Sequence, residues 1–203
     1  MNLFVRSALR HRSAKPIAWL VGLLPLVWLV WGAAYDALGA NPAEYVIRAT
    51  GDWTLRLLCL TLAITPLRVS LGLPEFAKFR RLFGLFTYFY VVLHLLCYSW
   101  LDMGFELEDI AHDIAKRPFI WVGFSAFVLL TPLAATSFNA AIRWLGAKRW
   151  QHLHKAVYGV AALAVLHFFW MRAGKNNFAE VAVYAGVLAL LLGWRMRRAI
   201  GRP

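Results

Sequence analysis

Six apolar stretches, each about 20 residues long, follow one another along this chain with little sequence between them. A helix needs about that length of mostly apolar residues to cross the hydrocarbon core of a bilayer. The composition is 61% hydrophobic and only 16% charged, which excludes an ordinary soluble domain. The sequence therefore predicts an all-α, polytopic membrane protein, a single domain over 1–203, with spans at 17–35, 53–71, 82–101, 118–136, 152–171 and 178–195.

A cleaved signal peptide is an alternative interpretation of the first apolar stretch. Small residues stand near its end, at Gly32, Ala33 and Ala34. The stretch is longer than the apolar core of a typical signal peptide and lacks a clean cleavage pattern, which favours a membrane span.

The charges of the loops predict how the spans are oriented. The first and third loops are mainly acidic and belong outside. The short fifth loop, with Arg172 and Lys175, fits this scheme less well. Both termini and the second and fourth loops are cytoplasmic by the positive-inside rule, since they carry Arg6, Arg10, Arg12, Lys15, Lys78, Arg80, Arg81, Arg143, Lys148, Arg149, Arg195, Arg197, Arg198 and Arg202.

The third loop contains a pattern typical of an amphipathic helix. Its apolar residues recur at helical spacing, and its acidic residues fall mainly on other faces of the helix. The apolar residues are Leu107, Ile110, Ala111 and Ile114, and the acidic ones are Glu106, Asp109 and Asp113. The helix is either a solvated connector or an acidic docking surface for an external partner. His112 in this loop is expected to be an exposed histidine.

Two of the apolar stretches each contain one histidine in matched surroundings, His94 in Val92–Leu96 and His167 in Val165–Phe169. An ionisable side chain is costly among lipid tails, so both are candidates for a functional site. Their spans run in the same direction and place them at one depth in the outer half of the membrane. We predict that these two imidazoles are the axial ligands of a b-type haem. The alternative is that each bonds a carbonyl or hydroxyl group of a neighbouring helix.

A third histidine, His154, precedes His167 by 13 residues, roughly 20 Å along a helix and near the cytoplasmic face. That is the depth expected of a second, inner haem, whose propionates Arg80 and Arg81 could pair with. Both histidines face one side only if the helix bends, and Gly159 is the expected position of the bend. Alternatively His154 is an interfacial histidine at the start of a span.

Other polar residues near the spans allow a simpler interpretation. His152 is expected to be interfacial rather than a ligand. Arg172 and Lys175 are either outer-loop charges or a clamp for the propionates of the outer haem. Cys59 and Cys97 lie inside apolar stretches, so neither a disulfide framework nor a cysteine-based metal site is indicated.

Several classes of function are excluded or disfavoured. Basic residues stand in short clusters rather than along one surface, which argues against nucleic-acid binding. No GxGxxG, P-loop or soluble segment long enough for a nicotinamide or flavin-reductase fold is found, so a reductant must come from elsewhere. Zinc is disfavoured because no cysteine or acidic residue stands near the depth of His94 and His167. A proton or metal-cation transporter using buried histidines is the alternative, although no Asp or Glu stands in the middle of a span.

Three segments together resemble the MsrQ family, also called YedZ, of the ferric-reductase-like transmembrane superfamily. They are the run Arg80–Leu85 leading to Leu93-His94-Leu95, the WxxLHxxxY pattern over Trp150–Tyr158, and His167 followed by Trp170. The resemblance covers essentially the whole chain. It implies that His94, His154 and His167 are the haem-binding histidines and ligate the iron.

The resemblance also implies a function and partners. The protein would be a haem-binding electron-transfer subunit in the bacterial inner membrane rather than a complete enzyme. It would pass electrons from the quinone pool or a cytoplasmic flavin reductase to a periplasmic molybdopterin-containing subunit that repairs methionine sulfoxide in oxidised proteins. FMN is implied beside one or two haems b, although no motif for it is readable here. A stand-alone ferric reductase or quinone-linked cytochrome would share the haem and differ in partners.

Overall fold

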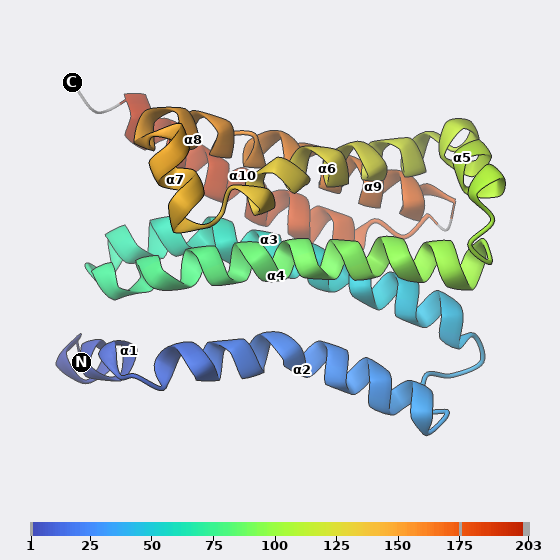
Figure 1. The fold of residues 1–203 in the computed structure, drawn as a ribbon, viewed down its shortest axis with the longest axis horizontal. Helices are drawn as coiled ribbons and strands as arrows, with labels where there is room; N and C mark the ends of the chain where they lie inside the picture. The colour runs from blue at the N-terminus through green and yellow to red at the C-terminus, as the bar shows by residue number, and fades with distance from the viewer. Residues whose placement is uncertain (1, 175, 201–203) are drawn as a thin grey trace. The chain divides into compact units, whose positions relative to one another are not determined.

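The computed structural model describes residues 2–174 and 176–200, and every regular element in them is a helix. This confirms the all-α prediction. The chain divides into two compact units, Met1–Cys97 and Tyr98–Pro203, called unit 1 and unit 2 below (Figure 1). The assignment of one domain to residues 1–203 stays a prediction.

Unit 1 is built around a pair of long helices that pack against each other, α3 and α4, with α2 packed on α4 (Figure 1). Asn41 begins α3 as its cap, because its side chain accepts a hydrogen bond of 3.1 Å from the N–H of Glu44. The elements of unit 1 are α1 (Asn2–Arg10), α2 (Ala14–Ala34), α3 (Pro42–Ser70), the 3₁₀ helix η1 (Pro74–Phe76) and α4 (Ala77–Cys97).

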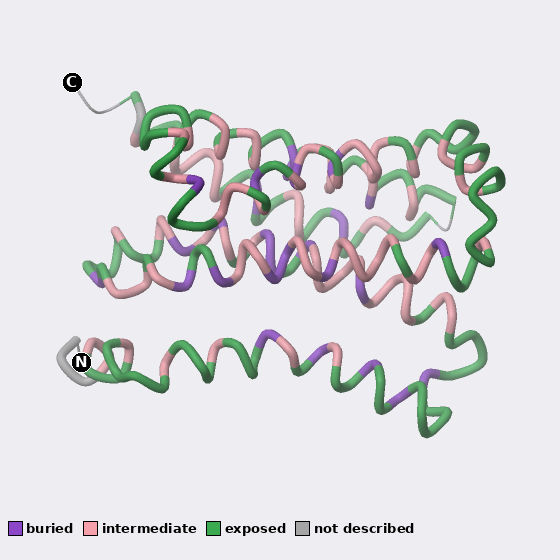
Figure 2. Tube along the Cα trace, viewed as in Figure 1, coloured by how far each residue is buried: buried purple, intermediate pink, exposed green. Residues whose placement is uncertain are grey.

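Tyr90 of α4 ties α2 into the core of unit 1. Its side chain is fully buried, and its hydroxyl group donates to the carbonyl of Gly22 at 2.9 Å and accepts from the N–H of Leu26 at 3.1 Å. In an uninterrupted helix these two backbone groups would bond each other. The Tyr90 hydroxyl therefore bonds both backbone groups of one turn of α2, the turn that contains Pro25. Figure 2 shows buried positions recurring along this helix.

Basic side chains gather at one end of unit 1. Arg6 donates to the carbonyl of Gly72 at 2.7 Å, and Arg10 pairs with Glu75 at 2.8 Å. Lys78 donates to the carbonyl of Leu9. These bonds bring the N-terminal helix to the turn between α3 and α4, so two segments predicted to be cytoplasmic lie at the same end of the unit.

Unit 2 contains two further packed helix pairs, α6 with α9 and α9 with α10, and α5 packs against α6. Arg195 of α10 lies over the ring of Tyr158, which places the basic end of α10 beside the start of α9. Arg202 and Lys175 lie outside the described residues. The elements of unit 2 are the π-helical turn η2 (Tyr98–Asp102), α5 (Leu107–Lys116), α6 (Pro118–Ala135), α7 (Asn139–Leu145), α8 (Ala147–His154), α9 (Val157–Ala173) and α10 (Ala179–Ile200).

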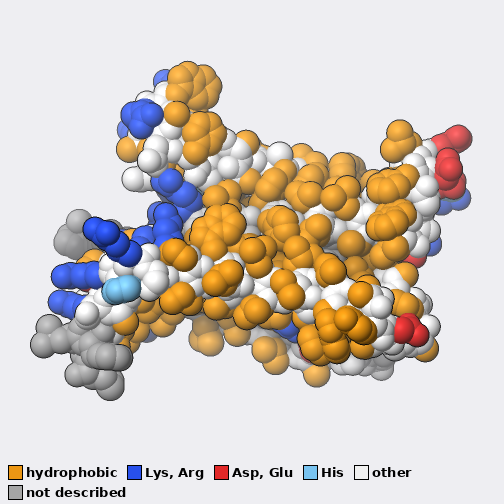
Figure 3. Space-filling view, turned by 60° about the horizontal axis from the view of Figure 1, so that its bottom comes forward, with side chains coloured by type: hydrophobic (Ala, Val, Ile, Leu, Met, Phe, Trp, Pro, Cys, Tyr) orange, Lys and Arg blue, Asp and Glu red, His pale blue; other side chains and the backbone are white. Residues whose placement is uncertain are grey.

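Five helical segments of the described residues are long and apolar enough to cross a membrane: Ala14–Ala34, Pro74–Asp102, Pro118–Ala135, Ala147–Ala173 and Ala179–Arg198. Each overlaps a predicted span. Their outward sides are apolar, and Figure 3 shows hydrophobic side chains over much of the visible surface. Many large apolar residues are exposed in this way, among them Leu20, Leu24, Trp28, Trp121 and Leu190.

The helix at the second predicted span, α3, differs from the other five. It starts at Pro42, so residues 42–52, expected to be loop, are helical. Arg56 and Arg68 lower the hydropathy of its apolar part, and α3 is not among the five segments. The sequence therefore placed the start of this helix too late, because Asn41 and Pro42 provide a strong helix start ahead of the apolar stretch.

The amphipathic helix predicted in the third loop is confirmed as α5. Glu106, at its N-cap, and Asp109 are exposed, as is His112. Asp113 differs, because it accepts a hydrogen bond of 2.7 Å from the Tyr98 hydroxyl and pairs with Arg117 at 2.8 Å. Asp113 therefore holds the loop together, and the exposed acidic face of α5 is formed by its other carboxylates.

The helix that carries His154 and His167 is interrupted directly after His154. The N–H of Lys155 donates to the carbonyl of His152 at 3.1 Å, and the N–H of Tyr158 donates to the carbonyl of Lys155 at 3.0 Å. Such bonds over three residues tighten the helix into a 3₁₀-like turn. The expected bend at Gly159 is wrong, since Gly159 lies within α9 and the change occurs four residues earlier.

Candidate functional site

His94 lies in the last turns of α4 and is held by the second turn of α3. Its Nδ1 is 2.8 Å from the carbonyl oxygen of Ile47. The buried hydroxyl of Thr50 donates to the same carbonyl at 2.8 Å and lies 3.4 Å from Nδ1. A carbonyl only accepts, so Nδ1 carries the proton and donates. In a neutral imidazole the lone pair is then on Nε2, the nitrogen suited to ligate a metal.

His167 repeats this geometry in unit 2. Its Nδ1 on α9 is 2.6 Å from the carbonyl oxygen of Phe119, in the first turn of α6. The same reasoning places the proton on Nδ1 and the lone pair on Nε2. The Phe119 ring lies 6.0 Å from the imidazole, centroid to centroid. Each histidine is thus oriented by a backbone carbonyl near the start of the helix packed against its own.

His154 is oriented differently, by groups of its own helix. Its Nδ1 is 3.0 Å from the carbonyl oxygen of Trp150, one turn earlier in α8. Its ring stacks on the Trp150 indole with centroids 3.9 Å apart. The indole N–H donates to the carbonyl of Thr136, at the end of α6, at 2.9 Å. The proton is again on Nδ1, and His154 is half-buried and fixed by a tryptophan that bridges α8 and α6.

These bonds bear on both interpretations of the histidines. Bonds from His94 and His167 to carbonyls of neighbouring helices are what the simpler interpretation predicts. They are also the bonds that a metal-ligating histidine normally makes with its other ring nitrogen. Because Nε2 is the lone-pair nitrogen in each case, each of the three neutral imidazoles presents a nitrogen of the kind that ligates a haem iron.

A site for a metal ion held by clustered side chains is not seen in the described part of the chain. Among residues 2–174 and 176–200, no group of three or more His, Cys, Asp or Glu is placed to hold an ion. Cys59 and Cys97 are half-buried and form no disulfide, as expected from the sequence.

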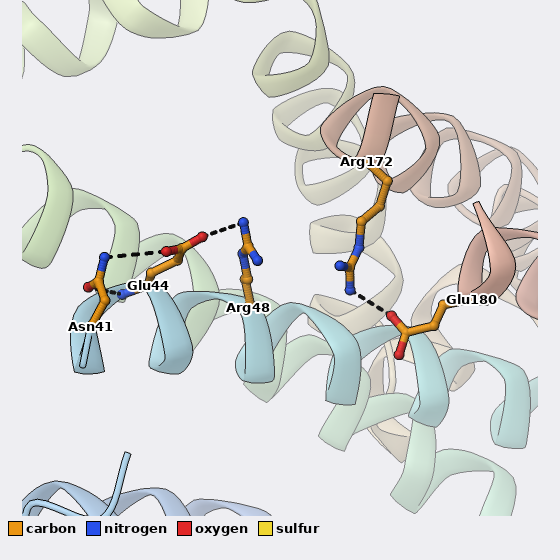
Figure 4. A network of polar contacts seen from close by, with 5 residues as sticks. All are labelled: Asn41, Glu44, Arg48, Arg172 and Glu180. Atoms are coloured by element: carbon orange, nitrogen blue, oxygen red, sulfur yellow. Dashed lines mark hydrogen bonds and ion pairs between the residues drawn. The ribbon is translucent and has the colours of Figure 1, made fainter. Parts of the chain in front are cut away.

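Arg172 pairs with Glu180 across the turn between α9 and α10, at 2.6 Å (Figure 4). Its guanidinium lies over the ring of Phe168, the neighbour of His167, at 5.3 Å. The Nε of Arg172 is buried with no hydrogen-bond partner among the described residues. That donor suits an anionic group such as a propionate, so the clamp interpretation is retained beside the ion pair.

Arg80 and Arg81 lie in the first turns of α4, and both are exposed. Figure 4 shows a separate polar network at the start of α3, where Glu44 contacts both Asn41 and Arg48. That network fixes the beginning of the helix that carries Ile47.

The sequence did not indicate the groups that orient the histidines. Ile47 and Phe119 act through backbone carbonyls, which every residue has, so their side chains gave no signal. Thr50 lies ahead of the predicted second span, so its position gives no sign of a contact with His94. Trp150 belongs to the WxxLHxxxY pattern, but its stacking on His154 depends on the short helix α8.

Comparison with known proteins confirms, over most of the chain, the family resemblance seen in the sequence. The family described as ferric reductase like transmembrane component matches residues 50–165. The protein-methionine-sulfoxide reductase heme-binding subunit MsrQ of Polaromonas naphthalenivorans is 70% identical over 188 residues, covering 93% of this chain and 86% of that protein. Proteins of the same name from Ralstonia nicotianae and Bordetella pertussis are 52% and 51% identical, over 91% and 90% of this chain and 85% and 88% of their own lengths.

Proposed function

Because this chain belongs to the MsrQ family, within the ferric reductase like transmembrane components, we propose that it is a haem-binding electron-transfer subunit of a methionine-sulfoxide reductase system. The observation that carries this proposal is the repeated geometry of His94 and His167. Each has Nδ1 bonded to a carbonyl of a neighbouring helix and the lone pair on Nε2. Two such imidazoles would hold a b-type haem through its iron.

The haem, when bound, supplies a one-electron carrier, and the protein's residues hold and tune it. His94 and His167 would ligate the iron, and Arg172 would pair with a propionate. His154, supported by Trp150, would serve a second, inner haem, with Arg80 and Arg81 as partners of its propionates. One haem or two, both of b type, are therefore included in the proposal.

The proposed topology has six spans, with α3 as the second, and both termini in the cytoplasm. The separation of charge within each unit supports it. In unit 1 the basic N-terminal segment meets the turn after α3. In unit 2 the basic segments of α7, α8 and α10 lie at one end, and the acidic helix α5 packs at the start of α6. A bacterial inner membrane is the proposed location, by the positive-inside rule.

The partners proposed are those of the family resemblance. Electrons would enter from the quinone pool or a cytoplasmic flavin reductase and leave to a periplasmic molybdopterin-containing subunit that reduces methionine sulfoxide. FMN is part of the same proposal and rests on the resemblance alone.

The test of the proposal is a dithionite-reduced minus oxidised visible spectrum of the purified protein, with haem quantified per chain. A b-type spectrum with at least about one haem per chain is expected. Protein expressed with ample haem and purified without any would overturn the proposal, and would favour a transporter that uses its buried histidines.

The acidic face of α5 is proposed as the docking surface for the external subunit. Neutralising exposed carboxylates by Glu106→Gln and Asp109→Asn should slow reduction of that subunit by about 10-fold or more at low salt, because opposite charge steers association. Asp113, which the sequence grouped with them, is left intact because it anchors Tyr98 and Arg117.

The readout for this prediction is stopped-flow oxidation of the reduced haem by the external subunit, at two ionic strengths. Haem content should stay at the wild-type level in the double variant. Asp36→Asn, at an exposed carboxylate in the turn after α2, is the control for loss of an acidic charge elsewhere. An unchanged rate at low salt would contradict the docking surface.

A further inference from the structure

A glycine lies against each of the two imidazoles, on the same helix that supplies the bonded carbonyl. A Cβ atom built on Gly51 of α3 would lie 3.1 Å from Cε1 and 3.2 Å from Nδ1 of His94. A Cβ built on Gly123 of α6 would lie 2.7 Å from Nδ1 and 2.8 Å from Cε1 of His167. Contacts below 3.0 Å are essentially never made by real Cβ atoms, so a side chain at position 123 requires the ring to move.

The spacing between carbonyl and glycine is the same in both units. Ile47 precedes Gly51 by four residues, and Phe119 precedes Gly123 by four. Residues four apart lie one above the other on a single helix face. Each ring therefore lies on the glycine while its Nδ1 reaches the carbonyl one turn away.

The residues between carbonyl and glycine have nothing in common. They are Arg-Ala-Thr in unit 1 and Ile-Trp-Val in unit 2. The Thr50 hydroxyl near His94 thus has valine as its counterpart in unit 2. What the two units share is a bare backbone beside the histidine, which points to the glycine itself as the required feature.

We propose that Gly51 and Gly123 are positioning residues for the two haem-ligating histidines, an inference that rests on the proposed function. The missing side chain lets each imidazole approach the helix closely enough to donate its Nδ1–H to the carbonyl. That bond fixes the rotation of the ring and increases the basicity of the ligand. Loss of the bond should weaken haem binding and raise the midpoint potential, because a less basic ligand stabilises ferric iron less.

The two positions should respond unequally to alanine. At Gly123 the new methyl group would overlap the ring outright, whereas at Gly51 the ring needs to give by only a few tenths of an ångström. Gly123→Ala should therefore weaken haem affinity by about 10-fold to 100-fold, as loss of a ligand's outer partner typically does. Gly51→Ala should have the smaller effect. Alanine favours helix over glycine, so weaker helix formation does not explain either loss.

The experiment is a haemin titration of the full-length protein in detergent, followed by a potentiometric titration of the bound haem. Gly186→Ala is the control, because a Cβ there meets nothing within 4 Å, and Gly84→Ala is a second, with an ordinary contact of 3.6 Å. We expect lower affinity and a raised midpoint potential for Gly123→Ala, a smaller change of the same sign for Gly51→Ala, and no change for the controls.

Wild-type affinity and potential in Gly123→Ala would overturn this inference and leave the proposed function standing. If Gly123→Ala does not yield folded protein, the midpoint potential of Gly51→Ala decides, and an unchanged value overturns the inference. Wild-type protein that binds no haem would overturn the proposed function itself, which separates the two failures.

Discussion

Replacing either His94 or His167 with alanine is expected to abolish the outer b-type haem. Each variant removes a proposed iron ligand. Haem affinity should therefore fall by more than about 100-fold, since loss of a ligand's hydrogen-bond partner alone costs about 10-fold to 100-fold. The measurement is haem per chain and the reduced minus oxidised spectrum of purified protein. Both variants should show the same loss, since one remaining imidazole does not form a bis-histidine haem.

Two additions make this experiment decisive. His112→Ala removes an exposed histidine of α5 and should leave the spectrum unchanged. Imidazole added to either alanine variant should restore part of the signal by occupying the vacated position. Wild-type haem content in His94→Ala or His167→Ala would show that the iron is ligated elsewhere.

His154→Ala separates one haem from two. If His154 serves a second site, this variant should lose part of its haem. It should keep the part of the visible spectrum that depends on His94 and His167. Full wild-type content would make His154 a structural residue that packs on Trp150.

The second large effect is expected on stability, at Tyr90. Tyr90→Ala removes a fully buried ring and should lower the free energy of unfolding by about 3–5 kcal/mol, the typical cost of an aromatic-to-alanine cavity. Tyr90→Phe keeps the ring and removes only the hydroxyl that bonds Gly22 and Leu26, so it should cost about 1 kcal/mol, the typical net contribution of a hydrogen bond. Denaturant unfolding in detergent micelles measures both.

Tyr35→Ala provides the matched control, since Tyr35 is 71% exposed at the end of α2. Its free energy of unfolding should lie close to that of the wild type. A cost for Tyr90→Phe as large as that for Tyr90→Ala would mean that the hydroxyl, and not the packing of the ring, holds α2 in unit 1.

The sequence predicted the helices well where the apolar stretch and the helix cover the same residues. The first, third, fourth and sixth predicted spans match α2, α4 with η2, α6 and α10. The prediction failed at α3, where Asn41 and Pro42 start the helix ahead of the apolar stretch. It failed again after His154, where the turn at Lys155 and Ala156 is set by backbone bonds and not by a glycine.

The sequence by itself determined that this is an all-helical membrane protein, and it predicted His94 and His167 as residues of a functional site. Bilayer thickness sets the length of an apolar helix, and an imidazole is costly among lipid tails unless it has a partner. The membrane class and the prediction for the two histidines therefore follow from residue type and spacing. Only the tertiary structure decided which groups orient each ring, namely the carbonyls of Ile47 and Phe119. Backbone carbonyls are identical in every residue, so their role depends on which helices pack together.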